Sequence, residues 1–176
     1  MLTNSKKLAY TSKTPGKTSE FNYFLAEGVT GPSKEKHSFY LVDVPGVGYA
    51  EVNKLLRVSW LDLLRDYSHR RTSLRLIFHL VDSRHGLLKA DEQCLSLLKS
   101  LPDHVNYAIV LTKADKRANE GREAIMKELK EALLQHTSRE VPVILSSSET
   151  REGGPALWSV MLDAFGGEHI LSDQPR

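Results

Sequence analysis

Asp43 and the residues after it stand where a strand-like stretch gives way to a loop. An apolar run begins at Phe39, and the stretch Asp43-Val44-Pro45-Gly46 ends it with residues that stop a strand and force a turn. In open α/β sheets, ligands bind at the carboxyl edge of the strands. A carboxylate there can hold hydrated Mg²⁺, and a glycine N–H can approach a phosphate closely. The stretch therefore suggests a nucleotide site. The spacing alone is weak evidence, because Asp163 to Gly166 has the same spacing and follows no strand.

The stretch Thr112-Lys113-Ala114-Asp115 follows a second apolar run and predicts recognition of a guanine base. A carboxylate accepts two parallel hydrogen bonds well, and guanine, unlike adenine, offers two adjacent donors on its base-pairing edge. The aliphatic stem of Lys113 can lie over the flat base while its ammonium stays in water. The alternative is a solvated loop after a strand. The presence of Asp43 at the end of an earlier predicted strand favours the nucleotide site over the solvated loop.

Two further stretches could bind the same ligand. Ser146-Ser147-Ser148 follows the last apolar run and would offer backbone N–H groups and hydroxyls to the guanine oxygen. Gly16-Lys17-Thr18 matches the end of the phosphate-loop signature G-x-x-x-x-G-K-[ST], but Thr11 stands at the first glycine position. A strand-like run follows it, whereas a phosphate loop opens a helix. We therefore interpret it as a switch loop, with Thr18 binding Mg²⁺ and the terminal phosphate. A helix starting after Thr18 would instead favour a degenerate phosphate loop.

The elements that must position these residues alternate between strand and helix. Apolar runs predict strands at 21–25, 39–43, 74–82, 105–111 and 141–145, and helical spacing predicts helices at about 52–67, 95–101, 125–133 and 157–162. The first two strands should form a hairpin. The alternation predicts an α/β fold whose mainly parallel sheet carries helices on both faces. Asp43, Asp115 and the three serines should then gather along one edge of that sheet.

Composition narrows the class of protein. The chain has 176 residues, 40% hydrophobic and 26% charged, which suits one domain with one core, and we expect a monomer with a frayed tail at about 167–176. A net charge of +2 is too small to argue for nucleic acid by itself. No apolar run reaches membrane-spanning length. The single Cys94 excludes an intramolecular disulfide and is predicted to lie in the core, as is His79.

With these motifs placed, the chain resembles the EngB-type (YihA-type) GTPases of the translation-factor-related class. The resemblance implies a P-loop NTPase-like G domain that binds GTP or GDP with Mg²⁺. It also implies a link to assembly of the large ribosomal subunit, or to its RNA, in the cytoplasm of bacteria or in an organelle such as a plastid or mitochondrion. It is carried by residues 11–18 and 43–50, by Trp60, Tyr67 and Arg70, by Asp82-Ser83-Arg84-His85-Gly86, by Thr112 to Asp115 and by the serine loop.

The resemblance also implies roles for single residues. Thr18 becomes a switch threonine, Asp43 a metal-side aspartate and Gly46 a γ-phosphate contact, while Lys113 and Asp115 recognise the base. Val47 stands where Ras-like GTPases carry a water-orienting glutamine, so no catalytic residue is named. The implied nucleotide-binding residues are Gly16, Lys17, Thr18, Ser19, Glu20, Asp43, Val44, Pro45, Gly46, Thr112, Lys113, Ala114, Asp115, Ser146, Ser147 and Ser148, with Thr18 and Asp43 as metal ligands.

One departure from the family concerns the beginning of the chain. The family's first strand, its phosphate-binding loop and most of its first helix would precede Leu2 and are missing from this sequence, and residues 1–6 resemble the end of that helix, so we expect an N-terminally truncated G domain. Two strand edges inside the sheet should then be left unpaired unless they pair directly. We expect weak GTP binding and no measurable hydrolysis, and single-turnover hydrolysis at a normal GTPase rate would contradict this. The alternative is a non-catalytic binding module without nucleotide.

Overall fold

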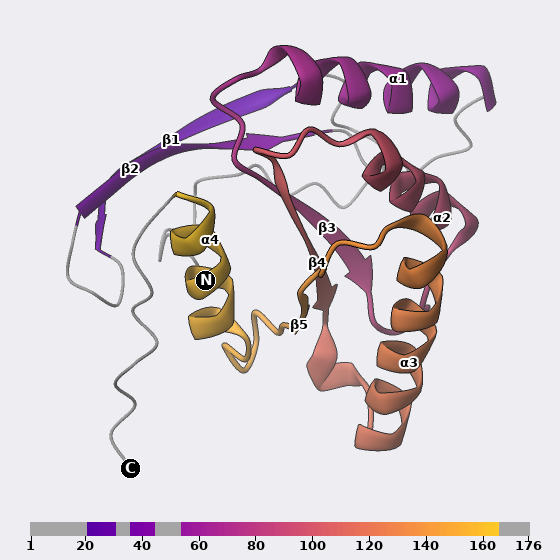
Figure 1. Cartoon of the computed structure of the whole chain (residues 1–176). Coiled ribbons are helices and arrows are strands. Elements are labelled where there is room, and N and C mark those ends of the chain that lie inside the picture. Colours follow the sequence, from indigo (N-terminus) through magenta and orange to yellow (C-terminus); the bar gives the residue numbers. More distant parts are fainter. Residues whose placement is uncertain (1–20, 31–35, 45–53, 166–176) are drawn as a thin grey trace.

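The computed structural model describes residues 21–30, 36–44 and 54–165 (Figure 1). Within these ranges no helix is long and apolar enough to cross a membrane. In chain order the elements are β1 (Asn22–Thr30), β2 (Lys36–Asp43), α1 (Lys54–Arg70), β3 (Leu76–Asp82), α2 (Lys89–Leu95), the 3-10 helix η1 (Ser96–Ser100), β4 (Asn106–Thr112), the 3-10 helix η2 (Ala114–Lys116), α3 (Asn119–His136), β5 (Val143–Leu145) and α4 (Gly154–Ala164).

A three-stranded parallel sheet, in the order β3-β4-β5, forms the centre of the fold. Leu95, Ile125 and Leu129 cover one face of it from α2 and α3, and Leu157 of α4 packs against Ile144 on the other. Figure 1 shows α3 and α4 on opposite sides of these strands. The apolar run of β4 is buried on both faces, as a central parallel strand requires. The predicted parallel sheet with helices on both faces is confirmed for these strands.

Strands β1 and β2 form the predicted hairpin, but as a separate two-stranded antiparallel sheet. They pair from Asn22 with Asp43 to Thr30 with Lys36, and the register shifts once, between Ala26 and Val29. Both strands are longer than predicted, because the pairing continues into the polar segment that the sequence assigned to the connection. The hairpin does not pair with β3, so among the described residues β3 has β4 as its one strand neighbour.

The hairpin is attached to the rest of the fold by aromatic side-chain contacts with helices, because neither of its strands pairs with the parallel sheet. Phe21, just before β1, stacks on Trp60 of α1 at 6.0 Å between ring centroids and meets Tyr67 edge-on at 5.2 Å. On β2, Phe39 packs against Trp158 of α4 at 6.4 Å and against Phe165 at 5.3 Å. The hairpin is therefore fixed by two helices, and its orientation follows from their surfaces.

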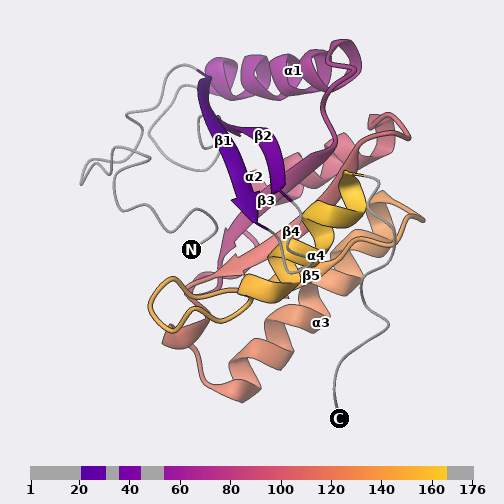
Figure 2. The same cartoon turned by 90° about the vertical axis from the view of Figure 1, so that its left-hand side faces the viewer.

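This orientation separates Asp43 from the carboxyl edge of the parallel sheet. Asp43 pairs with Asn22, beside the contact between Phe21 and Tyr67 near the end of α1, and a short turn connects that helix to the start of β3. β3 then runs for seven residues, roughly 20 Å, before it ends at Asp82. Figures 1 and 2 both show the end of β2 high in the view and the ends of β3 and β4 low.

The expectation that Asp43 and Asp115 share one edge is therefore wrong for this structure. A ladder fixes the direction and register of strands that pair, and β2 and β3 do not pair. Two smaller expectations also change. Helix α2 ends at Leu95, so that Leu97 and Leu98 lie in η1, and Leu80 of β3 is 63% exposed although its strand reads as buried on both faces.

The polar residues predicted for the core are where the sequence placed them. Cys94 is buried, and burial is the main reason why the pKa of its thiol rises to about 12. His79 is a largely buried residue of β3, hydrogen-bonded through Nε2 to Asp91 at 3.0 Å and through Nδ1 to the hydroxyl of Tyr107 at 2.8 Å. These bonds satisfy both ring nitrogens, and they join β3 to β4 and α2.

Candidate functional site

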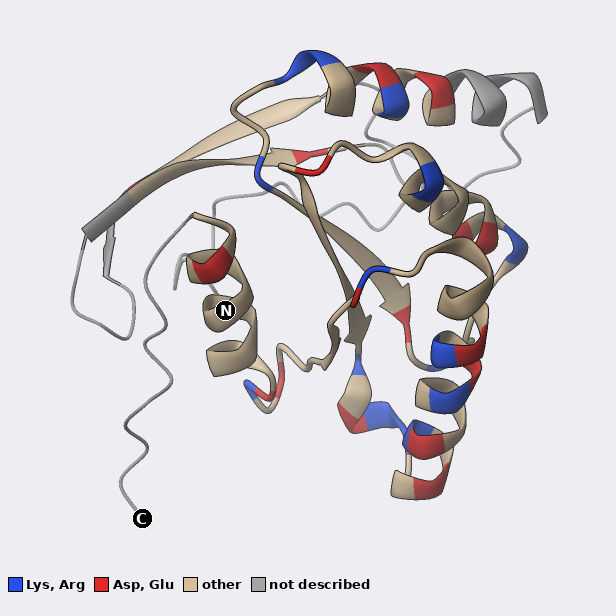
Figure 3. Cartoon of the chain, viewed as in Figure 1, with Lys and Arg blue, Asp and Glu red and all other residues tan. Residues whose placement is uncertain are grey.

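Three loops meet at the carboxyl edge of the parallel sheet, one after each of its strands. The N–H of Ser83 donates to the carbonyl oxygen of Thr112 at 3.0 Å, and the N–H of Ala114 donates to that of Ser146, also at 3.0 Å. These bonds continue the parallel register beyond the strands, which is why the loops stay adjacent. Figure 3 shows basic and acidic residues close together where β4 ends. The structure thus brings together the predicted residues of 112–115 and 146–148.

Asp115 is held in a defined orientation at this edge. The hydroxyl of Ser147 donates to its Oδ1 at 2.6 Å, and Lys116 lies 3.0 Å from its Oδ2. These contacts, with the Ser147 bond as the larger, hold the pKa of Asp115 below its ordinary value. The side chain is 12% exposed, whereas Lys116 lies on the solvent side. Each carboxylate oxygen has a second lone pair, so Asp115 can still accept two bonds from a ligand.

The serine loop contributes less directly than predicted. The N–H of Ser146 already donates to Leu111, and that of Ser147 to Glu152. The buried hydroxyl of Ser147 also accepts bonds from the N–H groups of Glu149 and Thr150, both at 3.2 Å, besides donating to Asp115. The expectation that all three serines offer N–H groups to a ligand is therefore wrong for two of them, because the loop uses those groups internally. Ser148 is the exposed serine of the three.

Lys113 has a left-handed backbone, with φ +57°, and its side chain turns toward β3. Its ammonium donates to Asp82 Oδ2 at 2.8 Å, while the side chain stays 48% exposed, so the ammonium is paired at the surface and still reaches water. Its carbonyl oxygen accepts the hydroxyl of the fully buried Ser83 at 3.0 Å. The loop after β3 therefore holds both the backbone and the side chain of Lys113.

Asp82 is a site residue for which sequence reasoning assigned no role. The guanidinium of Arg84 donates to the Asp82 carboxylate from Nε to Oδ1 at 3.0 Å and from Nη2 to Oδ2 at 2.8 Å. The backbone N–H of Arg84 also donates to Oδ1. The Arg84 bonds, aided by Lys113 and opposed by partial burial, hold the pKa of Asp82 well below its usual range. The signal was in the sequence, because Asp82 follows an apolar strand as Asp43 and Asp115 do.

The Asp82 cluster makes a prediction about stability and pH. The folded-state pKa lies below the unfolded one, so the carboxylate stabilises the fold above about pH 4, and this contribution is lost as the pH falls through the lowered pKa. We expect Asp82→Asn to lower the free energy of unfolding by about 1 kcal/mol at pH 7. The deficit should persist down to about pH 5 and shrink below about pH 4. Urea unfolding of the parent and of Asp82→Asn at a series of pH values from 7 to below about 4 measures this difference in the free energy of unfolding.

Asp62→Asn is the matched control, because Asp62 forms an exposed pair with Arg65 on α1. Such pairs contribute little, so this variant should unfold with the parent at every pH. A deficit of Asp82→Asn that stays constant at low pH would contradict the role given to the carboxylate.

The other predicted site residues are not part of this edge. Asp43 and Val44 lie at the end of the separate hairpin, away from these loops. Gly16, Lys17, Thr18, Ser19, Glu20, Pro45 and Gly46 lie outside the described residues. The stretches 21–30, 36–44 and 54–165 contain no group of three or more His, Cys, Asp or Glu side chains that could hold a metal ion. Mg²⁺ is commonly held by one or two carboxylates with waters and phosphate oxygens, so the roles of Thr18 and Asp43 as metal ligands stay predictions.

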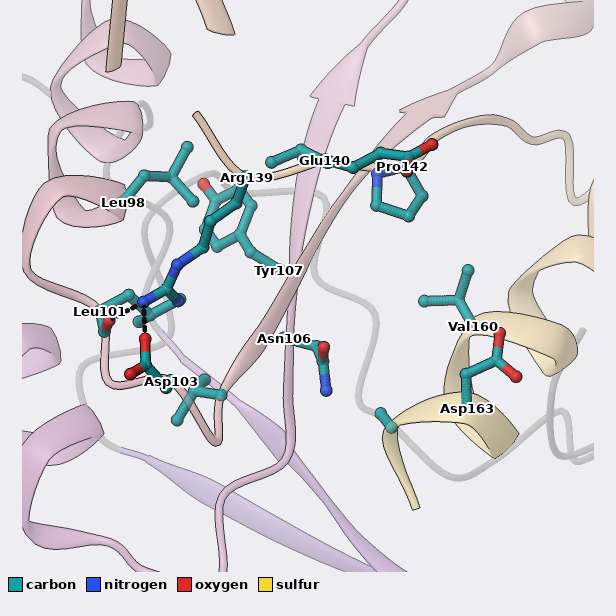
Figure 4. A pocket seen from close by; sticks show the side chains of 13 residues that line it. Leu98, Leu101, Asp103, Asn106, Tyr107, Arg139, Glu140, Pro142, Val160 and Asp163 are labelled. Carbon is teal, nitrogen blue, oxygen red and sulfur yellow. Dashed lines mark hydrogen bonds and ion pairs between the residues drawn. The ribbon is translucent and has the colours of Figure 1, made fainter. Parts of the chain in front are cut away.

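A pocket of about 360 Å³ lies at the amino ends of β4 and β5, away from the three loops. In it, Arg139 donates to the carbonyl oxygen of Leu101 at 3.0 Å and pairs with Asp103 (Figure 4). These bonds bind the residues before β5 to those before β4. The pocket contains none of the predicted nucleotide-binding residues.

Comparison with known proteins agrees with the motifs at the carboxyl edge. Residues 1–113 match the family described as 50S ribosome-binding GTPase. The "Probable GTP-binding protein EngB" of Roseobacter denitrificans is 41% identical over 162 residues, which is 92% of this chain and 70% of that protein. The protein of the same name from Cereibacter sphaeroides is 40% identical over 160 residues, which is 91% of this chain and 69% of that protein.

Solved structures show the same fold at lower identity. The translation elongation factor SelB of Methanococcus maripaludis, in complex with the GTP analogue GppNHp, superposes with a TM-score of 0.60 at 19% identity. The match covers 90% of this chain and 31% of that longer one. The described strands and helices thus have the arrangement of a G domain. By its sequence relatives and by the family that it matches, the chain belongs to the EngB family of GTP-binding proteins.

Proposed function

We propose that the chain binds GTP and GDP, and that the carboxyl edge of β3, β4 and β5 recognises their guanine base. The observation that carries the proposal is the Asp115 carboxylate, oriented by the buried hydroxyl of Ser147 at 2.6 Å. An anionic acceptor held in one geometry before the ligand arrives loses little conformational entropy on binding. Its two open lone pairs match the two adjacent donors of guanine.

Lys113 and Ser148 complete the recognition of the base. Asp82 anchors the ammonium of Lys113, so the aliphatic stem has a fixed course, and it can cover one face of the ring. Ser148 is the serine of its loop with an exposed position, and its N–H is the one that can donate to the guanine oxygen. Adenine would place an amino group against that N–H and a bare ring nitrogen against Asp115, so it is rejected.

Beyond the base, the proposal follows the family. Membership implies Mg²⁺ and phosphate binding by Thr18 and Gly46, which lie outside the described residues, and a role in assembly of the large ribosomal subunit. In this structure Asp43 lies away from the base-binding edge, so the same nucleotide would reach it only if the hairpin sat differently against the sheet. Mg²⁺ would supply positive charge beside the phosphates. No catalytic residue is assigned, because Val47 stands where Ras-like GTPases carry a water-orienting glutamine.

Calorimetry of the purified chain with GDP, with ADP as the control ligand, tests nucleotide binding. We expect heat from GDP alone, and we expect Asp115→Ala to abolish it, since this variant removes both acceptors. Circular dichroism shows whether the variant is folded. Absence of heat from the folded native chain would instead favour a binding module that uses no nucleotide.

A further inference from the structure

A second surface lies at the edge of the sheet opposite the candidate nucleotide site. It consists of Tyr23 and Tyr40 on the hairpin and of Arg70, Arg71 and Arg75 at the end of α1 and in the turn that follows. We propose that this tyrosine–arginine surface binds single-stranded RNA, with the arginines on phosphates and the tyrosines on unstacked bases. The inference concerns different residues from the proposed nucleotide site and stands independently of it.

The two tyrosines project from the same face of the hairpin. Tyr40 pairs with Leu25 in the ladder, and Tyr23, two residues before Leu25, therefore shares that face. Tyr23 is 45% and Tyr40 62% exposed, and their rings meet edge-on at 6.4 Å between centroids. This arrangement leaves the ring of Tyr40 accessible for stacking. Exposed aromatic rings on neighbouring strands are what many sheets use to stack single-stranded bases.

One of the three arginines, Arg71, is held beside these rings. The guanidinium carbon of Arg71 lies 5.7 Å from the centroid of the Tyr23 ring and 5.9 Å from that of Tyr67, and the hydroxyls of the two tyrosines are 3.4 Å apart. This contact fixes Arg71 against the hairpin at little cost, since cation–π contacts persist at exposed sites. The positive charge of Arg71 is therefore held next to the aromatic rings that would stack on bases.

Charge around the surface favours a phosphate backbone as its partner. Residues 67–81 contain Arg70, Arg71 and Arg75 but no Asp or Glu; the carboxylates of Asp66 and Asp82 flank this range, and that of Glu27 lies on the hairpin. Arg70 is 84% exposed and lies 3.7 Å from Asp66, a loose pair, and Arg75 bonds to the backbone carbonyls of Thr72 and Leu74, which leaves its charge uncancelled by these contacts. A partner that is purely apolar would not use these cations, and duplex RNA would not offer open base faces.

The test is fluorescence anisotropy with a labelled uridine oligonucleotide of about 12 nucleotides, titrated with the whole chain. Tyr40→Leu keeps an apolar side chain but removes stacking, and should weaken binding on the order of tenfold, whereas Tyr40→Phe should bind like the parent. The double variant Arg70→Gln, Arg75→Gln should lower the slope of log affinity against log salt by about 1. Lys127→Gln, on the exposed face of α3, is the control cation and should change neither quantity.

Each outcome decides for or against the surface. Weaker binding by Tyr40→Leu with normal binding by Tyr40→Phe supports base stacking, and a reduced salt slope supports phosphate contacts. Equal affinity of Tyr40→Leu and Tyr40→Phe, equal loss in Lys127→Gln, equal affinity for duplex RNA, or no binding at about 50 mM salt would each overturn the proposal. The substituted side chains are exposed, and circular dichroism confirms the fold of each variant.

Discussion

Replacing Asp115 by asparagine should reverse the base preference of the chain, weakening GDP binding on the order of 100-fold and admitting xanthosine diphosphate. Asparagine keeps one acceptor but places an N–H₂ donor where the second carboxylate oxygen stood. That donor opposes the exocyclic amino group of guanine, whereas xanthine offers a carbonyl oxygen at the same position. The hydroxyl of Ser147, which donates to Asp115 at 2.6 Å, can still bond to the amide oxygen, so the side chain stays in place.

Competition between the two nucleotides for a fluorescent GDP analogue measures this effect. The parent chain should prefer GDP, the variant should prefer xanthosine diphosphate, and Asp62→Asn, on the exposed face of α1, should retain the parent's preference. Equal losses for both nucleotides in a folded Asp115→Asn variant would show that Asp115 does not face the base. The reversal distinguishes base recognition from a general structural role, because a damaged fold would gain affinity for neither ligand.

Replacing Gly153 by alanine should destabilise the fold by about 2 to 4 kcal/mol. Gly153 caps the start of α4 with a left-handed backbone, at φ +82°, and a Cβ there would lie 2.1 Å from the carbonyl oxygen of Leu145. Both atoms of that clash belong to or adjoin the backbone, so neither side can move without distorting β5 or the serine loop. The midpoint of thermal unfolding should fall by roughly 5 to 15 °C.

Gly121→Ala is the matched control. Gly121 lies inside α3, where alanine is favoured, and its added Cβ would approach only the flexible side chain of Arg117, at 3.2 Å. We expect its unfolding midpoint to stay within a few degrees of the parent's. If both variants were equally stable in thermal denaturation, the close approach at Gly153 would not constrain this fold.

Those residues of the candidate site that directly follow a strand could be predicted from the sequence. The run before Thr112 is apolar and β-rich, so the strand and the position of Asp115 at its end follow from local sequence. Asp82 and Ser83 satisfy the same criterion, but their roles depend on contacts with Lys113, a residue thirty positions further along the chain. Local patterns do not specify which side chains from two loops will meet.

The sequence by itself determined the order of strands and helices, the buried central strand, the family, and the place of the 112–115 motif at a strand end, because each depends on residue types and spacings within a short stretch. Only the tertiary structure decided that Asp43 lies at the far edge, that Ser147 orients Asp115, and that Asp82 anchors Lys113. These depend on packing between distant segments: Phe21 and Phe39 attach the hairpin to α1 and α4, and no ladder ties it to β3.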